Sequence, residues 1–245
     1  MANADLESFK KCWEGVPTAS NSRIKLVRRL LTHLKSEIID YYDSRIKIDD
    51  PFPPFWFGEL QTNTFLTLAL AKLPELSGNI MQEYPIHRVQ GQTSSSGRVD
   101  YLCFLNGYYF AVETKQSFIR YCQQKRWTYL YKLKKLHQAA IKQLSALDGE
   151  AKSWLGWSVA ISMAPVAMFG KSLGHCLEKS QFRQIECALA DEFKPDNRRK
   201  ELQFVSGFQL PEKLATQKIQ CRTRLESYPA MFFIVTIRNG LDDSQ

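Results

Sequence analysis

Residues 98–115 read RVDYLCFLNGYYFAVETK, and this stretch decides which fold we expect. Two runs rich in β-branched and aromatic residues, 98–105 and 108–115, flank Asn106-Gly107. This dipeptide is the strongest short-range signal for a two-residue hairpin loop. Such a loop fixes the register, so cross-strand partners have residue numbers that sum to about 213. Asp100 is therefore expected opposite Glu113.

Two carboxylates that face each other on one side of a sheet repel, so this pair needs compensation. Lys115 projects from the same face one pleat further along. A divalent cation bridging Asp100 and Glu113 would turn the repulsion into coordination by hard oxygen ligands. The alternative is an exposed polar face on which Lys115 and Arg98 are ordinary ion-pair partners. Neighbouring positions on that face argue against free solvation because they are apolar: Leu102, Phe104 and Ala111.

The positive charge of the chain is concentrated in one segment. The 245 residues carry a formal net charge of +8. Residues 115–147 hold eight basic and no acidic residues, and the rest of the chain carries 25 of each. Aromatic side chains are interleaved with the cations: Phe118, Tyr121, Trp127, Tyr129 and Tyr131. Cations with stacking surfaces suit a phosphate backbone and its bases, although a solvated helix face is the alternative.

The second half of the basic segment, residues 128–147, has the pattern of an amphipathic helix. Lys132, Lys135 and Lys142 fall on one side at helical spacing. The opposite arc is apolar: Leu130, Leu133, Leu136, Ala140, Leu144 and Leu147. One face is therefore expected to pack and the other to present cations.

The remaining segments predict an α/β protein. Helical spacing is found over residues 22–45, 58–73 and 177–193, and strand patterns over 80–87, 154–163, 202–208 and 230–237. Residues 91–97 are expected to form a loop and 194–200 a polar linker. The prolines within residues 51–54 mark a boundary after the first helix.

Composition excludes several other classes of protein. Hydrophobic residues make up 44% and charged residues 24%, as in an ordinary globular domain rather than a disordered chain. No stretch resembles a membrane helix or a signal peptide, so a soluble cytoplasmic protein with no membrane partner is expected. The six cysteines form no Cys-x-x-Cys pair, which favours free thiols over a zinc site.

Asp100 followed by Glu113-Thr114-Lys115 at the end of a hairpin resembles the PD-(D/E)xK nuclease superfamily, which has the restriction-endonuclease-like fold. Glu59 in the preceding helix and the amphipathic helix that follows add to the resemblance. Val99 departs from it, since the family name has proline there. The resemblance implies an α/β core of mixed β-sheet flanked by helices in the order α-β-β-β-α-β. This core, about residues 58–163, would lie in a nuclease-like domain of residues 51–245, with an N-terminal helical extension of residues 1–50 and C-terminal additions.

The resemblance also assigns roles to individual residues. Asp100 and Glu113 would bind Mg²⁺ or Mn²⁺, with the backbone carbonyl of Thr114 as a further ligand. Lys115 would orient or activate the attacking water and stabilise charge on the phosphate. Glu59 matches the helix carboxylate of the family.

Two assignments stay open. Glu83, on the first expected strand, is a rival to Glu59 as the further carboxylate. Some family members have a glutamine in the helix after the lysine, and Gln138 and Gln143 are the candidates for that position.

The expected function is that of a Mg²⁺- or Mn²⁺-dependent phosphodiesterase, a deoxyribonuclease and DNA endonuclease. DNA is favoured over RNA as the partner, and a homodimer would suit an enzyme that cuts both strands. The alternatives are a catalytically inactive nucleic-acid-binding protein of the same fold, an RNA-cleaving nuclease, or an interaction domain for an acidic protein. The expected nucleic-acid surface comprises Arg98, Arg120, Lys125, Arg126, Trp127, Lys132, Lys134, Lys135 and Lys142.

Overall fold

The central feature of the fold is a mixed β-sheet. The computed structural model describes residues 22–48, 53, 59–76, 79–90, 93–105, 107–121, 130–147, 149–194, 201–221 and 224–239. Within these residues six strands form a path in the order β1-β2-β3-β5-β8-β6, with β4 beside β5 and β7 beside β8. β3 and β4 run parallel to β5, and the other neighbours are antiparallel. The strands are β1 (Ile80–Gln90), β2 (Thr93–Leu105), β3 (Tyr108–Gln116), β4 (Ile119–Tyr121), β5 (Leu155–Met168), β6 (Leu202–Gln209), β7 (Ile219–Cys221) and β8 (Arg224–Asn239).

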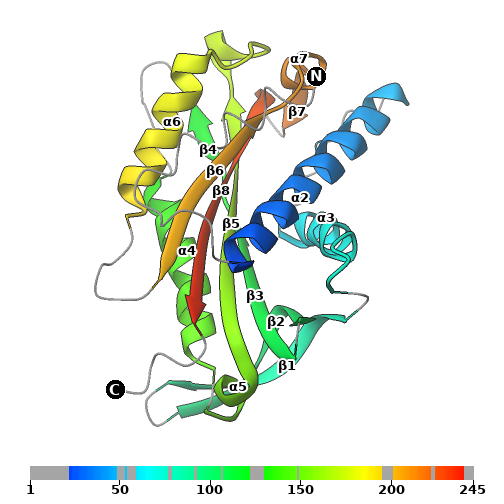
Figure 1. Cartoon of the computed structure of the whole chain (residues 1–245). Coiled ribbons are helices and arrows are strands. Elements are labelled where there is room, and N and C mark those ends of the chain that lie inside the picture. Colours follow the sequence, from blue (N-terminus) through cyan, green and yellow to red (C-terminus); the bar gives the residue numbers. More distant parts are fainter. Residues whose placement is uncertain are drawn as a thin grey trace.

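Helices cover both faces of the sheet and give three layers (Figure 1). α2 and α3 lie on one face, and α4 and α6 lie on the other. The helices are α2 (Ser22–Lys47), α3 (Glu59–Ala71), α4 (Leu130–Ser145), α5 (Gly149–Trp154), α6 (Lys179–Glu192) and α7 (Glu212–Ala215), with a short 3₁₀ helix, η1 (Gly170–Ser172). The expectation of an α/β protein with a mixed sheet flanked by helices is thus confirmed.

The two faces of the sheet hold separate apolar clusters. Between the sheet and α2 and α3, residues one helical turn apart, such as Leu34, Ile38 and Tyr42, are fully buried. On the opposite face α4 packs Ala140 and Leu144 on strands β2, β3 and β5. Burial on both faces explains why β5 and β8 read as nearly continuous apolar runs.

The predicted hairpin forms with the predicted register. Leu105 pairs with Tyr108 and Tyr101 with Val112, so partner numbers sum to 213 throughout the β2–β3 ladder. Gly107 has a φ of 87°, a conformation that glycine adopts without steric cost. The position of Asn106 lies outside the described residues.

The amphipathic pattern of the basic helix is also confirmed. In α4 the side chains of Leu133, Ala140 and Leu144 are buried against the sheet. The outward positions Lys132, Lys135 and Lys142 are exposed.

Other segment boundaries differ from the prediction. Residues 93–97 are not loop but the first part of β2, because they pair with β1 from Gln90↔Thr93 to Ile86↔Gly97. A strand rich in serine and glycine gives little periodic signal, so its pairing partner decides its structure. β5 and β8 are longer than expected, and the short elements β4, α5, α7 and β7 were not predicted. Most of the expected linker, residues 195–200, lies outside the described part of the chain.

Among the described residues, no helix is both long enough and apolar enough to cross a membrane.

Gly207 on β6 allows close packing of two aromatic rings, which leads to a prediction about stability. A Cβ atom at this position would lie 2.6 Å from Phe232 Cε1 and 3.1 Å from Phe182 Cζ. The two rings stack at 4.7 Å, and the Phe232 ring is fully buried, so it cannot move away freely. We expect Gly207→Ala to lower the free energy of unfolding by about 2 kcal/mol in urea titrations.

Gly156→Ala is the matched control for this prediction. The three atoms nearest to its added Cβ belong to Tyr108, an exposed residue at the start of β3, and none of them is closer than 3.0 Å. We expect this variant to lose less than about 1 kcal/mol. Equal losses in the two variants would show that overpacking at Phe232 is not the cause.

Candidate functional site

The candidate site is built on β3, on the face covered by α4. Side chains alternate along a strand, so Ala111, Glu113 and Lys115 share this face. Ala111 packs in the cluster that contains Ala140 and Leu144 of α4. Glu113 is buried with 2% of its surface exposed, and Lys115 Nζ lies 3.2 Å from Glu113 Oε1. Glu113 and Lys115 therefore share one face of the sheet, as the strand pattern predicts.

α4 and β1 each contribute one further side chain to Glu113. Gln143 of α4 lies between Glu113 and Arg88 of β1. With its amide nitrogen facing the carboxylate, Gln143 Nε2 donates to Glu113 Oε1 at 2.7 Å and its oxygen accepts from Arg88 Nη1 at 3.2 Å. Arg88 Nη2 lies 3.6 Å from Glu113 Oε2. Of the two glutamines considered from the sequence, Gln143 is thus the one that reaches the site.

Asp100 lies at the edge of this group and not in the expected ladder pair with Glu113. The β2–β3 ladder ends at Tyr101↔Val112. Beyond it, Asp100 Oδ2 accepts hydrogen bonds from the backbone nitrogen of Thr114 at 2.6 Å and from its hydroxyl at 2.5 Å. The Thr114 hydroxyl also lies 2.8 Å from Asn63 Oδ1 of α3. The expected direct pairing is corrected accordingly: the Asp100 carboxylate binds the residue next to Glu113.

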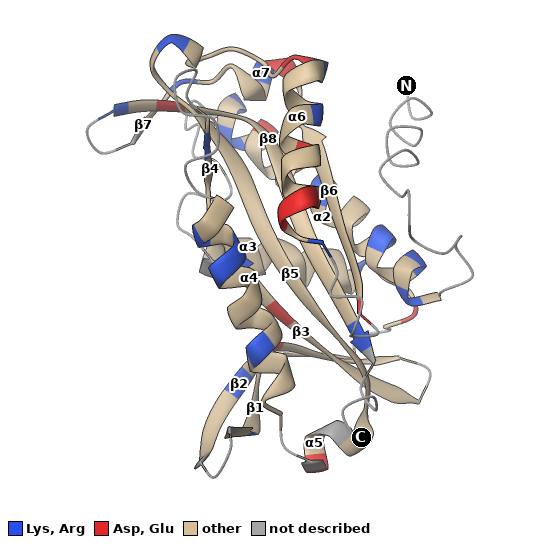
Figure 2. Cartoon of the chain, turned by 90° about the vertical axis from the view of Figure 1, so that its left-hand side faces the viewer, with Lys and Arg blue, Asp and Glu red and all other residues tan. Residues whose placement is uncertain are grey.

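A bend in the antiparallel ribbon of β1 and β2 explains this difference. The β1–β2 ladder omits the Glu83–Asp100 pair, and Glu83 has a φ of 52°, which a residue with a side chain rarely adopts. Beyond the bend the ribbon leaves β3 and meets the end of α4, where Val89 N donates to Ala146 O at 2.6 Å. Figure 2 shows β1 and β2 extending beside that end of α4. The bend places Asp100 where the two strands separate.

The environment of Glu113 opposes its negative charge. Burial is the main cause and the charge of Asp100 the second, and together they raise the pKa of Glu113 to about 7. Lys115 and Arg88 act in the opposite direction but do not cancel the burial. A carboxyl group that titrates near neutral pH beside a lysine is typical of functional sites.

The donors at this site fit a divalent cation in part. Glu113 Oε2 is buried and has no hydrogen-bond partner among the described residues, so a lone pair is free for a cation. Carboxylate oxygens are the ligands that Mg²⁺ and Mn²⁺ prefer. No group of three or more Asp, Glu, His or Cys side chains gathers in the described residues. A complete set of ligands would therefore need backbone carbonyls such as that of Thr114, water, or groups outside those residues.

Of the two glutamates that are candidates for the further carboxylate, only Glu83 has a side chain within the described part of the chain. Glu59 is the first residue of α3, but its side chain lies outside the described part of the chain. Glu83 is exposed at the ribbon bend and forms an ion pair with Arg98, with 3.9 Å between Glu83 Oε2 and Arg98 Nη1. No hydrogen bond or ion pair links Glu83 to the groups around Glu113 among the described side chains.

The expected nucleic-acid residues fall into four groups. Lys132, Lys135 and Lys142 lie on the outward face of α4, which stands in front of the sheet in Figure 2, and Arg98 and Arg120 lie on β2 and β4. Lys134 differs, because it faces α6 and forms an ion pair with Glu192 at 2.8 Å. Three of the predicted residues lie outside the described part: Lys125, Arg126 and Trp127.

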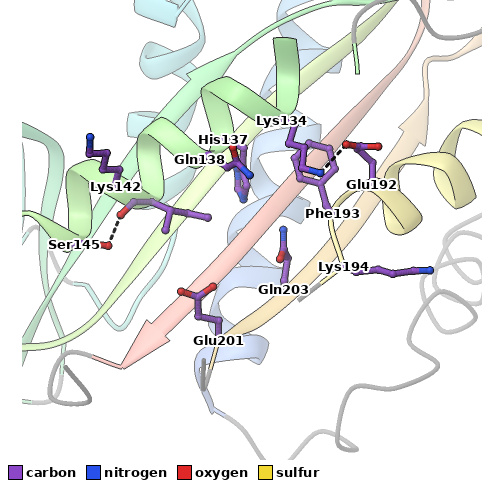
Figure 3. Close-up of a pocket in the computed structure, with 11 residues that line it drawn as sticks. Lys134, His137, Gln138, Lys142, Ser145, Glu192, Phe193, Lys194, Glu201 and Gln203 are labelled. Atoms are coloured by element: carbon purple, nitrogen blue, oxygen red, sulfur yellow. Dashed lines mark hydrogen bonds and ion pairs between the residues drawn. The ribbon is translucent and has the colours of Figure 1, made fainter. Parts of the chain in front are cut away.

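A pocket of about 530 Å³ lies on the other flank of α4, toward α6 and β6 (Figure 3). Glu113 and Lys115 are not among its lining residues. Its buried His137 uses both ring nitrogens, at 2.8 Å from Ser162 Oγ and 2.9 Å from Thr236 Oγ1. His137 is at helical spacing from the buried Leu133 and Ala140 of α4, so it packs on the same side of the helix. The pocket is lined by Lys134, His137, Gln138, Ile141, Lys142, Ser145, Glu192, Phe193, Lys194, Glu201 and Gln203.

The chain matches no family model, and searches of curated proteins and of solved structures also found no match.

The sequence does not indicate Arg88 as a residue of the site, and it offers Gln143 only as one of two candidates. Arg88 carried no signal, because its approach to Glu113 depends on the ribbon bend. Gln143 lies next to the buried Leu144 on α4, so its position at the edge of the apolar arc was the available signal. Gln138, the other candidate, lines the pocket instead.

Proposed function

We propose that this chain is a divalent-metal-dependent nuclease of the PD-(D/E)xK superfamily that hydrolyses phosphodiester bonds in DNA as an endonuclease. The observation that carries the proposal is the buried Glu113 with Lys115 Nζ 3.2 Å from its carboxylate, next to Asp100 on the neighbouring strand. The order α3-β1-β2-β3-α4-β5 supports it, since it agrees with the α-β-β-β-α-β order that the resemblance implies. The short elements β4 and α5 are additions to that order.

The residues of the site suit this chemistry. A divalent cation held by Glu113 and Asp100 would neutralise charge on the phosphate and lower the pKa of a water molecule. Lys115 Nζ lies beside the same carboxylate, where it can stabilise charge that develops on a phosphoryl oxygen. Gln143 fixes the orientation of Glu113 from α4. Thr114 holds the Asp100 carboxylate at the strand edge.

The outward face of α4 supports a nucleic acid as the substrate. Lys132, Lys135 and Lys142 are exposed on the helix whose inner edge delivers Gln143 to Glu113. Contacts from such cations to phosphates give affinity with little sequence information. The proposal therefore places the DNA backbone along α4, beside the carboxylate site.

A nucleic-acid-binding protein without cleavage is the second candidate. Asp100 Oδ2 already accepts two hydrogen bonds from Thr114, a structural use that would suit a carboxylate with no metal to bind. The basic face of α4 would serve such a protein equally well.

Cleavage assays with supercoiled plasmid, linear duplex, single-stranded DNA and RNA test the proposal. Each substrate is incubated with Mg²⁺, with Mn²⁺ or with EDTA. We expect nicking or linearisation of the plasmid with either metal and none with EDTA. Cleavage of RNA alone would favour the ribonuclease alternative, whereas DNA binding without cleavage under any condition would favour the binding protein.

A further inference from the structure

Arg88 is directed into the site by the ribbon and not by the central sheet. Gly97 lies on the facing strand, and a Cβ atom there would come within 2.9 Å of Arg88 Cδ and Nε. The missing side chain leaves room for Arg88 to cross the ribbon. An isolated β-bridge also joins the backbone of Arg88 to that of Leu147, just after α4. The local backbone is therefore held on two sides, and the arginine side chain is 14% exposed.

The contact between Arg88 and Glu113 is an ion pair without a hydrogen bond. Arg88 Nη2 lies 3.6 Å from Glu113 Oε2, and that oxygen has no hydrogen-bond partner among the described residues. Arg88 Nε is likewise buried without a hydrogen-bond partner among them. The guanidinium is anchored instead by Arg98 O and by Gln143. A loose ion pair of this kind is displaced at lower cost than a bidentate one.

The charges of the site balance without a metal. Glu113 faces two cations, Lys115 and Arg88, and the nearby Asp100 adds a second negative charge. A divalent cation would bring two further positive charges within a few ångströms of the guanidinium, in a site with little solvent to screen them. Binding becomes favourable when Arg88 moves away or when an anion joins the site. A phosphate group of DNA supplies such an anion, and arginine is well suited to bind it.

We propose that Arg88 is the counter-cation of Glu113 in the metal-free protein. When a divalent cation binds Glu113, Arg88 leaves this carboxylate and binds a phosphate of the substrate. This inference rests on the proposed function and assigns Arg88 a role in coupling metal binding to substrate binding. Because such coupling is reciprocal, DNA raises the affinity for metal by the factor by which metal raises the affinity for DNA.

Titration of the full chain with Mn²⁺, followed by the electron paramagnetic resonance signal of the free ion, tests the inference. It is carried out at pH 8 with and without a short DNA duplex that has hydrolysis-resistant linkages. For the wild type we expect the duplex to tighten Mn²⁺ binding about tenfold. For Arg88→Met we expect Mn²⁺ alone to bind about tenfold more tightly than to the wild type, with little further gain from the duplex.

Two further variants separate charge from structure. Arg88→Lys keeps the positive charge and is expected to resemble the wild type in Mn²⁺ affinity. Lys213→Met removes a cation of α7 whose side chain is 61% exposed and paired with Asp43, and we expect no change in metal binding. Thermal unfolding of each variant shows whether its fold is kept.

The inference is overturned if Arg88→Met binds Mn²⁺ with unchanged or lower affinity than a wild type that binds the ion. That result leaves the nuclease proposal intact if the wild type cleaves DNA. The opposite outcome, tighter Mn²⁺ binding by Arg88→Met with no cleavage by the wild type, supports the role of Arg88 and contradicts the nuclease proposal. A wild type that binds no Mn²⁺, even with DNA, overturns both.

Discussion

Replacing Lys115 with alanine is expected to lower the rate of metal-dependent DNA cleavage about a thousandfold and to leave DNA affinity within about twofold. The ammonium group lies 3.2 Å from the buried Glu113 carboxylate, so it is the cation nearest to the proposed metal ligand. It is also 15% exposed, which allows it to meet a phosphate that approaches along α4. Its loss removes a charge needed mainly when charge develops on the phosphoryl group.

The matched control for this prediction is Lys142→Ala on the outward face of α4. Lys142 is exposed and has no contact with Glu113 among the described residues. We expect this variant to weaken DNA binding severalfold and to keep most of its rate at saturating DNA. Single-turnover cleavage and fluorescence anisotropy separate the two effects. If Lys115→Ala instead weakens binding and spares the rate, the lysine belongs to the DNA surface and the catalytic assignment is wrong.

A loss of folding could imitate a loss of catalysis, but we expect Lys115→Ala to keep its fold. Removing the lysine leaves Glu113 buried without one of its partners. The carboxyl group can respond by binding a proton, because its pKa is already raised to about 7. The expected cost to stability is therefore small, and circular dichroism checks it directly.

Local sequence signals predicted those parts of the fold that local forces determine. Asn106-Gly107 sets a register that holds along the whole β2–β3 ladder. The spacing of leucines and lysines on α4 assigns both its buried and its exposed face. Glu113 and Lys115 lie two residues apart on one strand, so strand geometry alone places them on one face.

The remaining features depend on contacts between distant segments. The ribbon bend at Glu83 separates Asp100 from the ladder, and no residue pattern near it announces a bend. Arg88 reaches Glu113 only because the bent ribbon meets the end of α4. Gln143 meets both of them only because α4 crosses β3 at this level. Such contacts arise from the packing of whole elements, which periodicity does not encode.

The second prediction with a large effect concerns how the free energy of unfolding depends on pH. Two buried groups, Glu113 and His137, have pKa values that are shifted in opposite directions. Burial and the charge of Asp100 raise the pKa of Glu113 from its ordinary value of 4.5 to about 7. Burial lowers the pKa of His137 from 6.5 to about 4. The folded protein thus holds an extra proton on Glu113 between pH 4.5 and 7, and the unfolded chain holds an extra proton on His137 between pH 4 and 6.5.

The signs of the two contributions follow from this. Glu113 lowers the free energy of unfolding as pH rises through 7, and His137 lowers it as pH falls through 4. Each shift of about 2.5 in pKa corresponds to about 3 kcal/mol. In the wild type the two slopes oppose each other between pH 4.5 and 6.5, so these groups together add little pH dependence there.

In Glu113→Gln the free energy of unfolding should keep the pH dependence that His137 contributes and lose the opposing one from Glu113. In EDTA we expect this variant to resemble the wild type at pH 4.5 and to exceed its free energy of unfolding by about 3 kcal/mol at pH 8. Lys115 and Arg88 lose their partner in the variant, but the raised pKa of Glu113 already includes their favourable effect. Urea titrations at pH 4.5, 6 and 8 measure the difference, with Glu150→Gln on the exposed surface of α5 as control. A variant less stable than the wild type at pH 8 would mean that the Glu113 charge stabilises the fold. The expected gain would instead show that the chain keeps a destabilising carboxylate at this position, as a protein does when the group serves function.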